Sequence, residues 1–598
     1  MKLNRILLGA MAAGVLASCG DMDYHEDLRL DRAYIDRNFE YVGGLMNAIY
    51  TDLDTDFGNF SGAMLSSATD ESEYSTSGNT IENFYNGAWS PANPMQTMWT
   101  RAYEGITYCN EVLDNWQGLT FPEFEMDKDY AKKMHQYQNY QYEARWARAY
   151  FYYVLVRQYG AVPFKTHNST GDEETALPRT SVDEIFNFID SECADIQDKI
   201  VKDYTDLGDM AYGSPEKGRA TMFSVMALRA QAALYHASPL FNPNNNADLW
   251  YKAAVTSRDL IDSCELNNRH TLSASYDKLW GYNSAEFYSD ADFYREALFG
   301  RRVAASNSFE GYNFPVGYSA GKGGNCPTQD MVDAYNMTNG MMIGETGSGY
   351  DAQDPYTNRD PRFALTIAHN GEAWPTDIAN TSYTTLQTYV GGYHARPRTS
   401  YATPSSYYLK KLCQRSQILR TGYTTTAAHV WLTFRTGGAY LNYAEALFQY
   451  FKAQGNANAA DATNADFPRS AREMASKTRQ RVGMPAFAAG MNNDEFWTRY
   501  KNERQVELAF EGHRFYDIRR WKEDGNKFMN IHRMEITPVY TTTTDADGNT
   551  TTEITSYTYN VVPYTRGNGQ WQEKWNLFPI PQTEIMKSGG AITQNPGW

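Results

Sequence analysis

The stretch QYEARWARAYFYYVLVRQYGAVP, residues 141–163, sets the fold class of this chain. Small and apolar residues recur in it three and four positions apart, which is the spacing of one helical face over 141–159. Gly160 and Pro163 follow, and both residue types end helices. The stretch therefore predicts a long helix whose inward face consists of Ala144, Ala147, Phe151, Val154 and Leu155.

Further segments carry the same period and predict helices over about 219–236, 248–264, 438–452 and 468–481. Ser181 and Glu184 form a capping box at the start of another helix, and we expect Asp248 to cap the helix over 248–264. Small residues stand where neighbouring helices would cross, which resembles tetratricopeptide-type pairing. The full repeat consensus is not visible, so a generic helical bundle is the alternative.

The composition of the chain limits the functions that it can have. The chain has 598 residues, of which 42 % are hydrophobic, enough for a sizeable core. Its net charge of −17 argues against nucleic acid as a partner, because phosphate binding needs a surplus of Lys and Arg. After the N-terminal segment, no apolar run is long enough to span a membrane.

The N-terminal residues predict a targeting signal and a lipid anchor. Lys2 and Arg5 precede a short apolar region over 6–16, and Leu16-Ala17-Ser18-Cys19 resembles the lipobox of bacterial lipoproteins. We expect residues 1–18 to be a signal peptide, Cys19 to be lipidated, and 19–30 to be an acidic linker. Its acidic residues resemble the signal that sends Bacteroidetes lipoproteins to the cell surface. A plain secretory signal with a chance cysteine, and a merely solvated linker, are the alternatives.

The other five cysteines are scattered and form no CxxC pattern, so neither a metal site nor a redox motif is indicated. Their odd number cannot pair completely within one chain. Cys193 and Cys264 fall on the apolar faces of expected helices, which favours buried thiols.

Catalytic motifs find little support. The chain has no GxSxG, HExxH or Walker pattern. Glu503, Glu507 and Glu511 stand four apart and so share one helical face, whereas a glycosidase needs carboxylates on two sides of the scissile bond. We therefore expect a structural ion-pair network, with countercharges from Arg504, Arg514, Arg519 and Arg520.

Residues 536–562 alternate Thr, Tyr, Ile and Val around Asp547-Gly548, which predicts a β-hairpin. Asp545, Asp547 and Asn549 give only a faint resemblance to a calcium loop, because the glycine is misplaced for one. We read these residues as a turn. No cofactor is expected, although structural calcium is possible.

Aromatic side chains gather in polar, Gly/Asn-rich segments. The chain has 45 Tyr, 28 Phe and 13 Trp. Flat rings stack on the apolar faces of sugars while Asp, Asn and Arg bond the hydroxyls, so such clusters suit glycan capture. An individual aromatic residue is more often part of the core. Arg396 with Arg398 forms a local basic patch that would favour anionic polysaccharides.

Several segments together resemble the SusD/RagB family of Bacteroidetes outer-membrane lipoproteins. The resemblance runs in family order from the lipobox to the last residues. Its motifs lie at 148–163, Ala237–Asn242, Cys326–Tyr335, Asn358–Phe363, Tyr440–Ala446, Glu503–Trp521 and 578–597.

This resemblance implies a mainly α, SusD-like unit over 31–598. Four tetratricopeptide-like helix pairs would form the scaffold, at about 31–265 and 437–530. A loop-rich ligand-binding part with short strands would occupy about 266–436, followed by a hairpin insertion at about 536–570. The resemblance also places the ligand site in the loops over 70–89 and about 280–318. Within them we expect Trp89, Trp280, Tyr288 and Tyr312 to stack on sugar, and Asp70 and Asn313 to bond hydroxyls.

The sequence thus leads to a non-catalytic glycan-binding lipoprotein, anchored in the cell outer membrane and facing the exterior. The resemblance further implies a SusC-like TonB-dependent transporter that receives the glycan. Two alternatives stay open at this stage: a RagB-like binder of peptides or glycopeptides, and a surface glycoside hydrolase.

Overall fold

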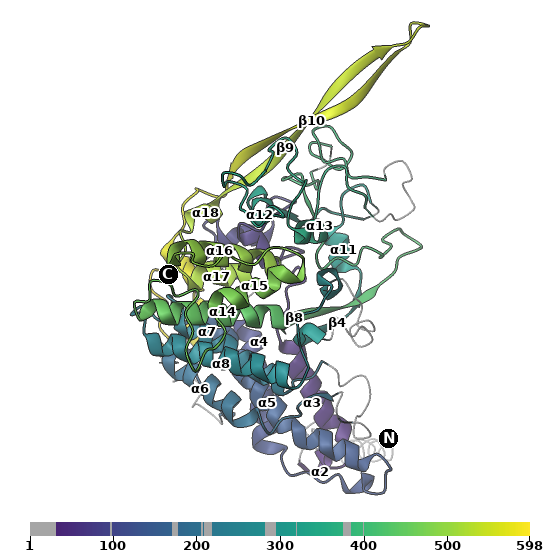
Figure 1. Cartoon of the computed structure of the whole chain (residues 1–598). Coiled ribbons are helices and arrows are strands. Elements are labelled where there is room, and N and C mark those ends of the chain that lie inside the picture. Colours follow the sequence, from purple (N-terminus) through teal and green to yellow (C-terminus); the bar gives the residue numbers. More distant parts are fainter. Residues whose placement is uncertain are drawn as a thin grey trace, which may run out of the picture.

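A computed structural model gives the structure of residues 32–598, except 96–97, 170–176, 205–206, 208–217, 281–294, 319, 375–383 and 399. Cys19 and Tyr288 therefore lie outside the described residues, as does the expected signal peptide. Figure 1 shows a helical body, a loop-rich part beside it, and a long two-stranded arm projecting from the top.

The scaffold is a series of helices in which each packs on the next, from α3 through α8 to α14 and α15. The series confirms the mainly helical, SusD-like fold class. Its members are α3 (Phe39–Asp52), α4 (Trp99–Asn115), α5 (Tyr130–Tyr159), α6 (Val182–Ile196), α7 (Met222–Ala237), α8 (Ala247–Leu266), α14 (Thr436–Ala453) and α15 (Ala471–Arg481), preceded by the short α2 (Arg32–Ile35).

Local sequence explains where these helices begin and end. The 141–163 stretch is the second half of α5, which Gly160 ends with a positive φ of 70°. Ser181 and Glu184 make both hydrogen bonds of the expected capping box on α6. The cap of α8 was predicted wrongly, because the Asn246 side chain, not that of Asp248, accepts a hydrogen bond, from the Asp248 amide.

The loop-rich part has its own hydrophobic core, separate from the scaffold core. Its longest strands, β4 (Ala297–Ser306) and β8 (Ala427–Arg435), pair antiparallel. Short helices surround them: α11 (Ser308–Asn313), α12 (Gln329–Ala334) and α13 (Pro361–Thr366). The remaining short strands pair as β1 (Ser72–Tyr74) with β5 (Asn325–Pro327), β2 (Val162–Pro163) with β3 (Arg179–Thr180), and β6 (Ile367–Ala368) with β7 (Tyr408–Leu409).

Helix α16 (Asn493–Glu507) connects the two cores. Phe496 and Tyr500 pack in the scaffold core, whereas Val506 packs in the core of the loop-rich part. Shorter helices follow it in the chain: α17 (His513–Arg520), α18 (Asn526–Met529) and α19 (Gln582–Lys587).

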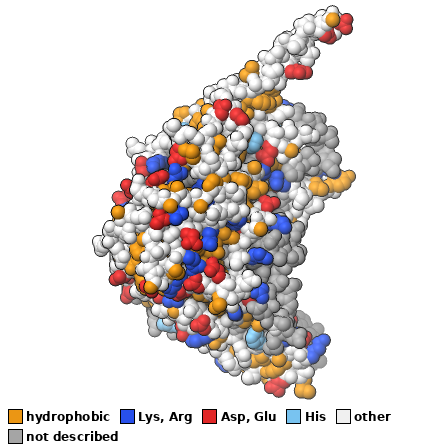
Figure 2. All heavy atoms as spheres, in the orientation of Figure 1, with side chains coloured by type: hydrophobic (Ala, Val, Ile, Leu, Met, Phe, Trp, Pro, Cys, Tyr) orange, Lys and Arg blue, Asp and Glu red, His pale blue; other side chains and the backbone are white. Residues whose placement is uncertain are grey.

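The hairpin expected from the Thr/Tyr alternation is present as β9 (Asn530–Thr544) and β10 (Thr550–Thr565). At its base Ile536 is fully buried, but farther out Tyr540 is 58 % exposed. Asp545 closes the turn by accepting hydrogen bonds from the Asp547 and Asn549 amides. The arm stands clear of the body, with acidic side chains at its tip (Figure 2).

Among the described residues, no helix is long and apolar enough to cross a membrane. Cys193 and Cys264 are buried, as predicted, and so are Cys109, Cys326 and Cys413. All five are free thiols. Burial raises the pKa of each, which keeps them protonated and unreactive.

Candidate functional site

Asp70 follows the turn Leu65–Ala68, in the long connection between α3 and α4. Its carboxylate accepts hydrogen bonds from Nε and Nη2 of Arg514, at 2.9 and 2.8 Å. Both side chains are mostly buried, and this pairing raises the pKa of Arg514. Asp70 thus fastens its loop to α17 through a bidentate ion pair, and its expected contact with sugar stays a prediction.

Trp89 is buried, with 3 % of its surface exposed. Its ring makes edge contacts with Phe84, Phe578 and Trp598, at centroid distances of 4.8, 4.9 and 5.0 Å. Other aromatic rings thus occupy the surface that a sugar would need. Trp89 is a core residue of the scaffold, and the stacking role expected for it does not fit the structure.

Trp280 is only 8 % exposed. The Lys411 ammonium lies 4.0 Å from its ring centroid, and the Arg435 guanidinium lies 5.2 Å away. Tyr276 packs against the ring edge-on at 5.7 Å. These groups enclose the indole, so the expected stacking platform is again a buried packing residue.

Asn313 is fully buried at the end of α11. Its Nδ2 donates to the Phe309 carbonyl at 2.8 Å, and its Oδ1 accepts from the Asn325 backbone amide at 3.0 Å. Asn325 also donates its side-chain amide to Asn313 Oδ1 at 2.8 Å. Asn313 therefore holds α11 to β5, and the structure corrects its expected contact with ligand.

Tyr312 is partly accessible, as is Asp70. The Lys322 ammonium lies 5.2 Å from its ring centroid. Its ring lies close against Gly62, where a Cβ would be 2.5 Å from the ring; φ is +96° there. A glycine at position 62 is thus required for this placement. The ligand role of Tyr312 stays a prediction.

Two further tyrosines contact the segment that follows Tyr312: a Cβ at Gly317 would be 2.2 Å from the Tyr393 ring, and one at Gly323 would be 2.3 Å from the Tyr401 carbonyl oxygen. The Arg398 guanidinium lies 4.3 Å from the Tyr393 ring, and Tyr401 is 50 % exposed. The segments are tied together because Ser75 donates to the Lys322 carbonyl at 2.8 Å and accepts, through its own carbonyl, from Arg396. We name the set Tyr312, Lys322, Tyr393, Arg398 and Tyr401 the loop face.

The loop face carries two cationic side chains, those of Lys322 and Arg398. His394, stacked on Tyr318 at 5.5 Å, lies beneath it. Burial, with a smaller contribution from Arg398, lowers the pKa of His394 to about 4, so the imidazole is neutral. Burial also raises the pKa of Tyr318 to about 12. The loop face therefore offers tyrosine rings and cationic donors, a combination that suits rings rich in hydroxyl acceptors.

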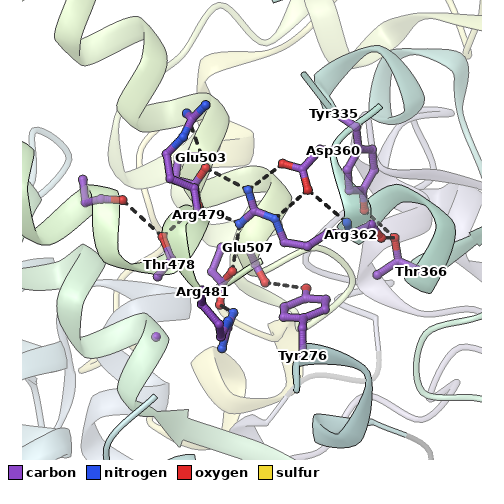
Figure 3. A network of polar contacts seen from close by, with 12 residues as sticks. Tyr276, Tyr335, Asp360, Arg362, Thr366, Thr478, Arg479, Arg481, Glu503 and Glu507 are labelled. Atoms are coloured by element: carbon purple, nitrogen blue, oxygen red, sulfur yellow. Dashed lines mark hydrogen bonds and ion pairs between the residues drawn. The ribbon is translucent and has the colours of Figure 1, made fainter. Parts of the chain in front are cut away.

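The acidic helix face forms an ion-pair network, as the sequence indicates (Figure 3). Glu503 and Glu507 both accept from Arg362 Nη1, at 2.6 and 2.9 Å. Arg435 bonds Glu507 and Glu511, at 2.7 and 2.8 Å. These partners lower the pKa of Glu511 and hold that of Glu507 well below its usual range, although burial alone would raise both.

The expected countercharges were wrong, because the partners come from elsewhere in the chain. Arg504 and Arg520 bond Asp517, at 2.8 Å each, while Arg514 bonds Asp70. Arg519 donates to the carbonyls of Trp575 and Phe515 instead. Glu503 and Glu507 share a face of α16, as their spacing indicates, but α16 ends at Glu507, so Glu511 was wrongly placed on that helix. Only the fold determines which arginines reach these acids.

Within the described part of the chain, no three His, Cys, Asp or Glu side chains are arranged to hold a metal ion. A structural calcium ion stays a prediction.

Comparison with known families shows where the chain belongs. The profile described as "SusD family" matches residues 282–598, just over half of the chain. A second profile, described as "Starch-binding associating with outer membrane", matches residues 42–234. This helical-scaffold protein, with a loop-rich part inserted between α8 and α14, therefore belongs to the SusD family.

Solved structures share the fold. A SusD-like protein from Bacteroides fragilis is 20 % identical, with a TM-score of 0.71 over 96 % of this chain and 99 % of its own. A second B. fragilis structure, described as a SusD-like carbohydrate binding protein, is 17 % identical, with a TM-score of 0.68 over 92 % and 99 %. Surface glycan-binding protein A from Bacteroides uniformis is 17 % identical, with a TM-score of 0.59 over 93 % and 99 %. Among curated proteins there is no significant match.

Sequence reasoning missed Tyr393 and Tyr401 as individual candidates. A signal was present, because residues 389–401 are rich in Tyr and Gly and include Arg396 and Arg398. Similar small and polar residues surround Trp89, however, so composition alone could not distinguish a solvent-exposed ring from a buried one.

Proposed function

We propose that this protein is a non-catalytic, lipid-anchored glycan-binding protein of the cell outer membrane. In this proposal it faces the exterior, captures oligosaccharide or polysaccharide, and delivers it to a SusC-like TonB-dependent transporter. Membership of the SusD family carries the proposal. The description of the second profile, which names starch binding and the outer membrane, supports it.

The loop face supplies the capture chemistry. Tyrosine rings bind the apolar faces of sugar rings, while Lys322 and Arg398 donate hydrogen bonds to hydroxyl oxygens. No bond in the glycan needs to break for this purpose. The acidic face of α16 is committed to arginine partners in a buried network, which supports a structural role for those carboxylates.

Affinity gels and a glycan array test the proposal, using residues 20–598 without the lipidated cysteine and a peptide pool alongside. Tyr401→Ala and Tyr312→Ala remove rings from the loop face. The matched control is Tyr34→Ala, because Tyr34 is similarly exposed at 43 % but lies in α2, at the opposite end of the molecule (Figure 1). Release of products is followed in the same samples.

We expect one class of polysaccharide to retard the wild type and Tyr34→Ala, with weaker retardation of both loop-face variants and no cleavage. Binding of peptides alone would replace the proposal with peptide uptake. Hydrolysis would replace it with a surface glycosidase. Retardation equal in all variants would move the site away from the loop face.

A further inference from the structure

A cavity of about 230 Å³ lies where the scaffold meets the loop-rich part. Its walls come from the connection after α3, from α4, α5 and α7, from β8, and from the turn into α17. A bound water occupies roughly 10–15 Å³ of such a volume, so this cavity holds far more than one structural water. The cavity is distinct from the loop face, because none of the loop-face residues lines it.

One part of the wall is aromatic. Trp431 and Phe434 contribute rings from β8, and Phe60 contributes a ring from the connection after α3. Phe57 packs edge-on against Trp431 at 5.3 Å and holds it in place. Gly512 stands beside the indole with φ +78°, and a Cβ there would be 3.5 Å from Trp431 Cζ2. Fixed rings around a concave space are typical of small-molecule sites.

Neutral hydrogen-bonding groups line the facing wall. Tyr153, Gln231 and Tyr235 line this wall together. The Tyr516 hydroxyl accepts from Gln158 Nε2 at 3.1 Å. The Thr433 hydroxyl is buried and has no partner among the described residues. Hydroxyls and amides both donate and accept, so they match the mixed pattern of a polyol.

Two ionisable groups on the cavity wall, Asp54 and Arg157, are paired with each other. Asp54 accepts hydrogen bonds from Tyr150 and from Arg157, the latter at 3.1 Å. Arg101, at the rim, donates to backbone carbonyls of Thr51 and Leu53. The Asp54–Arg157 pair leaves no net charge on that part of the wall, which favours a neutral ligand there.

His513 and Asp56, which also line the cavity, favour a neutral ligand with hydroxyl groups as well. Burial, with a smaller contribution from Arg504, lowers the pKa of His513 to about 4, so it is neutral at physiological pH. Asp56 is buried, and its Oδ1 has no partner among the described residues; Oδ2 accepts from the Leu65 amide at 2.8 Å. Burial raises the pKa of Asp56 to about 7. An acceptor of this kind suits a ligand that brings hydroxyl groups.

From this arrangement we infer that the cavity binds one neutral, hydroxyl-rich ring, the size of a single sugar residue, at a site separate from the loop face. A hexose has about twelve heavy atoms, which this volume accommodates. The inference rests on the proposed function for the class of ligand, since a sugar-capturing protein meets free sugar ends. The polymer would bind to the loop face, while the cavity would take a monosaccharide or a chain end.

Isothermal titration calorimetry of the soluble chain with a panel of neutral monosaccharides tests this inference. Thr433→Phe fills part of the cavity without removing a hydrogen bond made by the described residues. Tyr153→Phe removes one hydroxyl and keeps the ring. Tyr401→Ala, on the loop face, is the matched control. Circular dichroism and thermal melting show whether each variant is folded.

We expect at least one monosaccharide to bind the wild type and Tyr401→Ala equally, with at least tenfold weaker binding to folded Thr433→Phe and a smaller loss for Tyr153→Phe. Monosaccharide binding that Tyr401→Ala abolishes and Thr433→Phe leaves intact would overturn the inference, as would a wild type that binds polymer but no monosaccharide. A chain that binds neither sugar form would overturn the proposed function as well.

Discussion

Arg362→Met removes the cation at the centre of the buried network and keeps most of the side-chain volume. Arg362 is about 1 % exposed and donates to three carboxylates: Glu503 at 2.6 Å, Asp360 at 2.7 Å and Glu507 at 2.9 Å. Glu507 keeps Arg435 and Arg481 as partners, but Asp360 loses the only cationic side chain that ion-pairs with it among the described residues. Removal of one partner from a buried ion pair costs about 3–5 kcal/mol, because the charge left behind stays buried.

The matched control is Arg145→Met. Arg145 also bonds two carboxylates at 2.7 Å, Glu192 and Asp195, but it is 23 % exposed. Water can replace the lost cation there, and pairs of this kind contribute about 0.2–1 kcal/mol. The two variants therefore make the same chemical change in a buried and in a partly hydrated setting.

Scanning calorimetry and urea titration measure both variants. Unfolding entropy is about 2.1 cal/mol/K per residue, so a loss of about 4 kcal/mol lowers Tm by about 3 °C if all residues unfold together. If the loop-rich part, about 170 residues, melts separately, the same loss lowers its Tm by about 11 °C. A destabilisation of Arg362→Met below about 1 kcal/mol, or equal to that of Arg145→Met, would refute the reasoning.

The remaining predictions concern a packed ring, a buried acid and the arm. Trp89→Ala should lower the free energy of unfolding by about 3–5 kcal/mol, measured by urea titration, whereas Tyr401→Ala should change it by less than about 0.5 kcal/mol; equal effects would contradict the burial of Trp89. Burial raises the pKa of Glu71 from 4.5 to about 8, so the wild type should lose stability as pH rises from about 4.5 to 8. Glu71→Gln should remove this loss, making the variant the more stable protein at pH 9 but not at pH 5; parallel stability curves would count against this. Replacing residues 538–557 by an Asn-Gly turn should leave Tm within about 2 °C, because the removed residues lie outside both cores apart from the edge contact of Tyr557; a larger drop would show that the arm stabilises the body.

The helical scaffold was predictable because helices form between residues that are close together in the sequence. The period of the 141–163 stretch, the Ser181–Glu184 capping box and the stop at Gly160 each involve residues within a few positions of one another. The N-cap of α8 was predicted two residues too late. Asn and Asp both cap helices well, so the local sequence does not decide between Asn246 and Asp248.

Which aromatic residues of the loops are exposed was not predictable from the sequence. Trp89 and Tyr401 both stand among small and polar residues, yet one is 3 % and the other 50 % exposed. The difference comes from Phe578 and Trp598, both far away in the sequence near the C-terminal end of the chain, which cover Trp89. No pattern around Trp89 carries information about those contacts.

The sequence by itself determined the helical class, the segmentation, the hairpin and the shared face of Glu503 and Glu507, because each depends on spacing along one segment. Tertiary structure alone decided which arginines pair with those acids, which aromatic rings are presented, and where the cavity between the two cores lies. Burial is the physical reason: whether a ring or a charge meets water depends on the residues packed over it, and these come from distant parts of the chain.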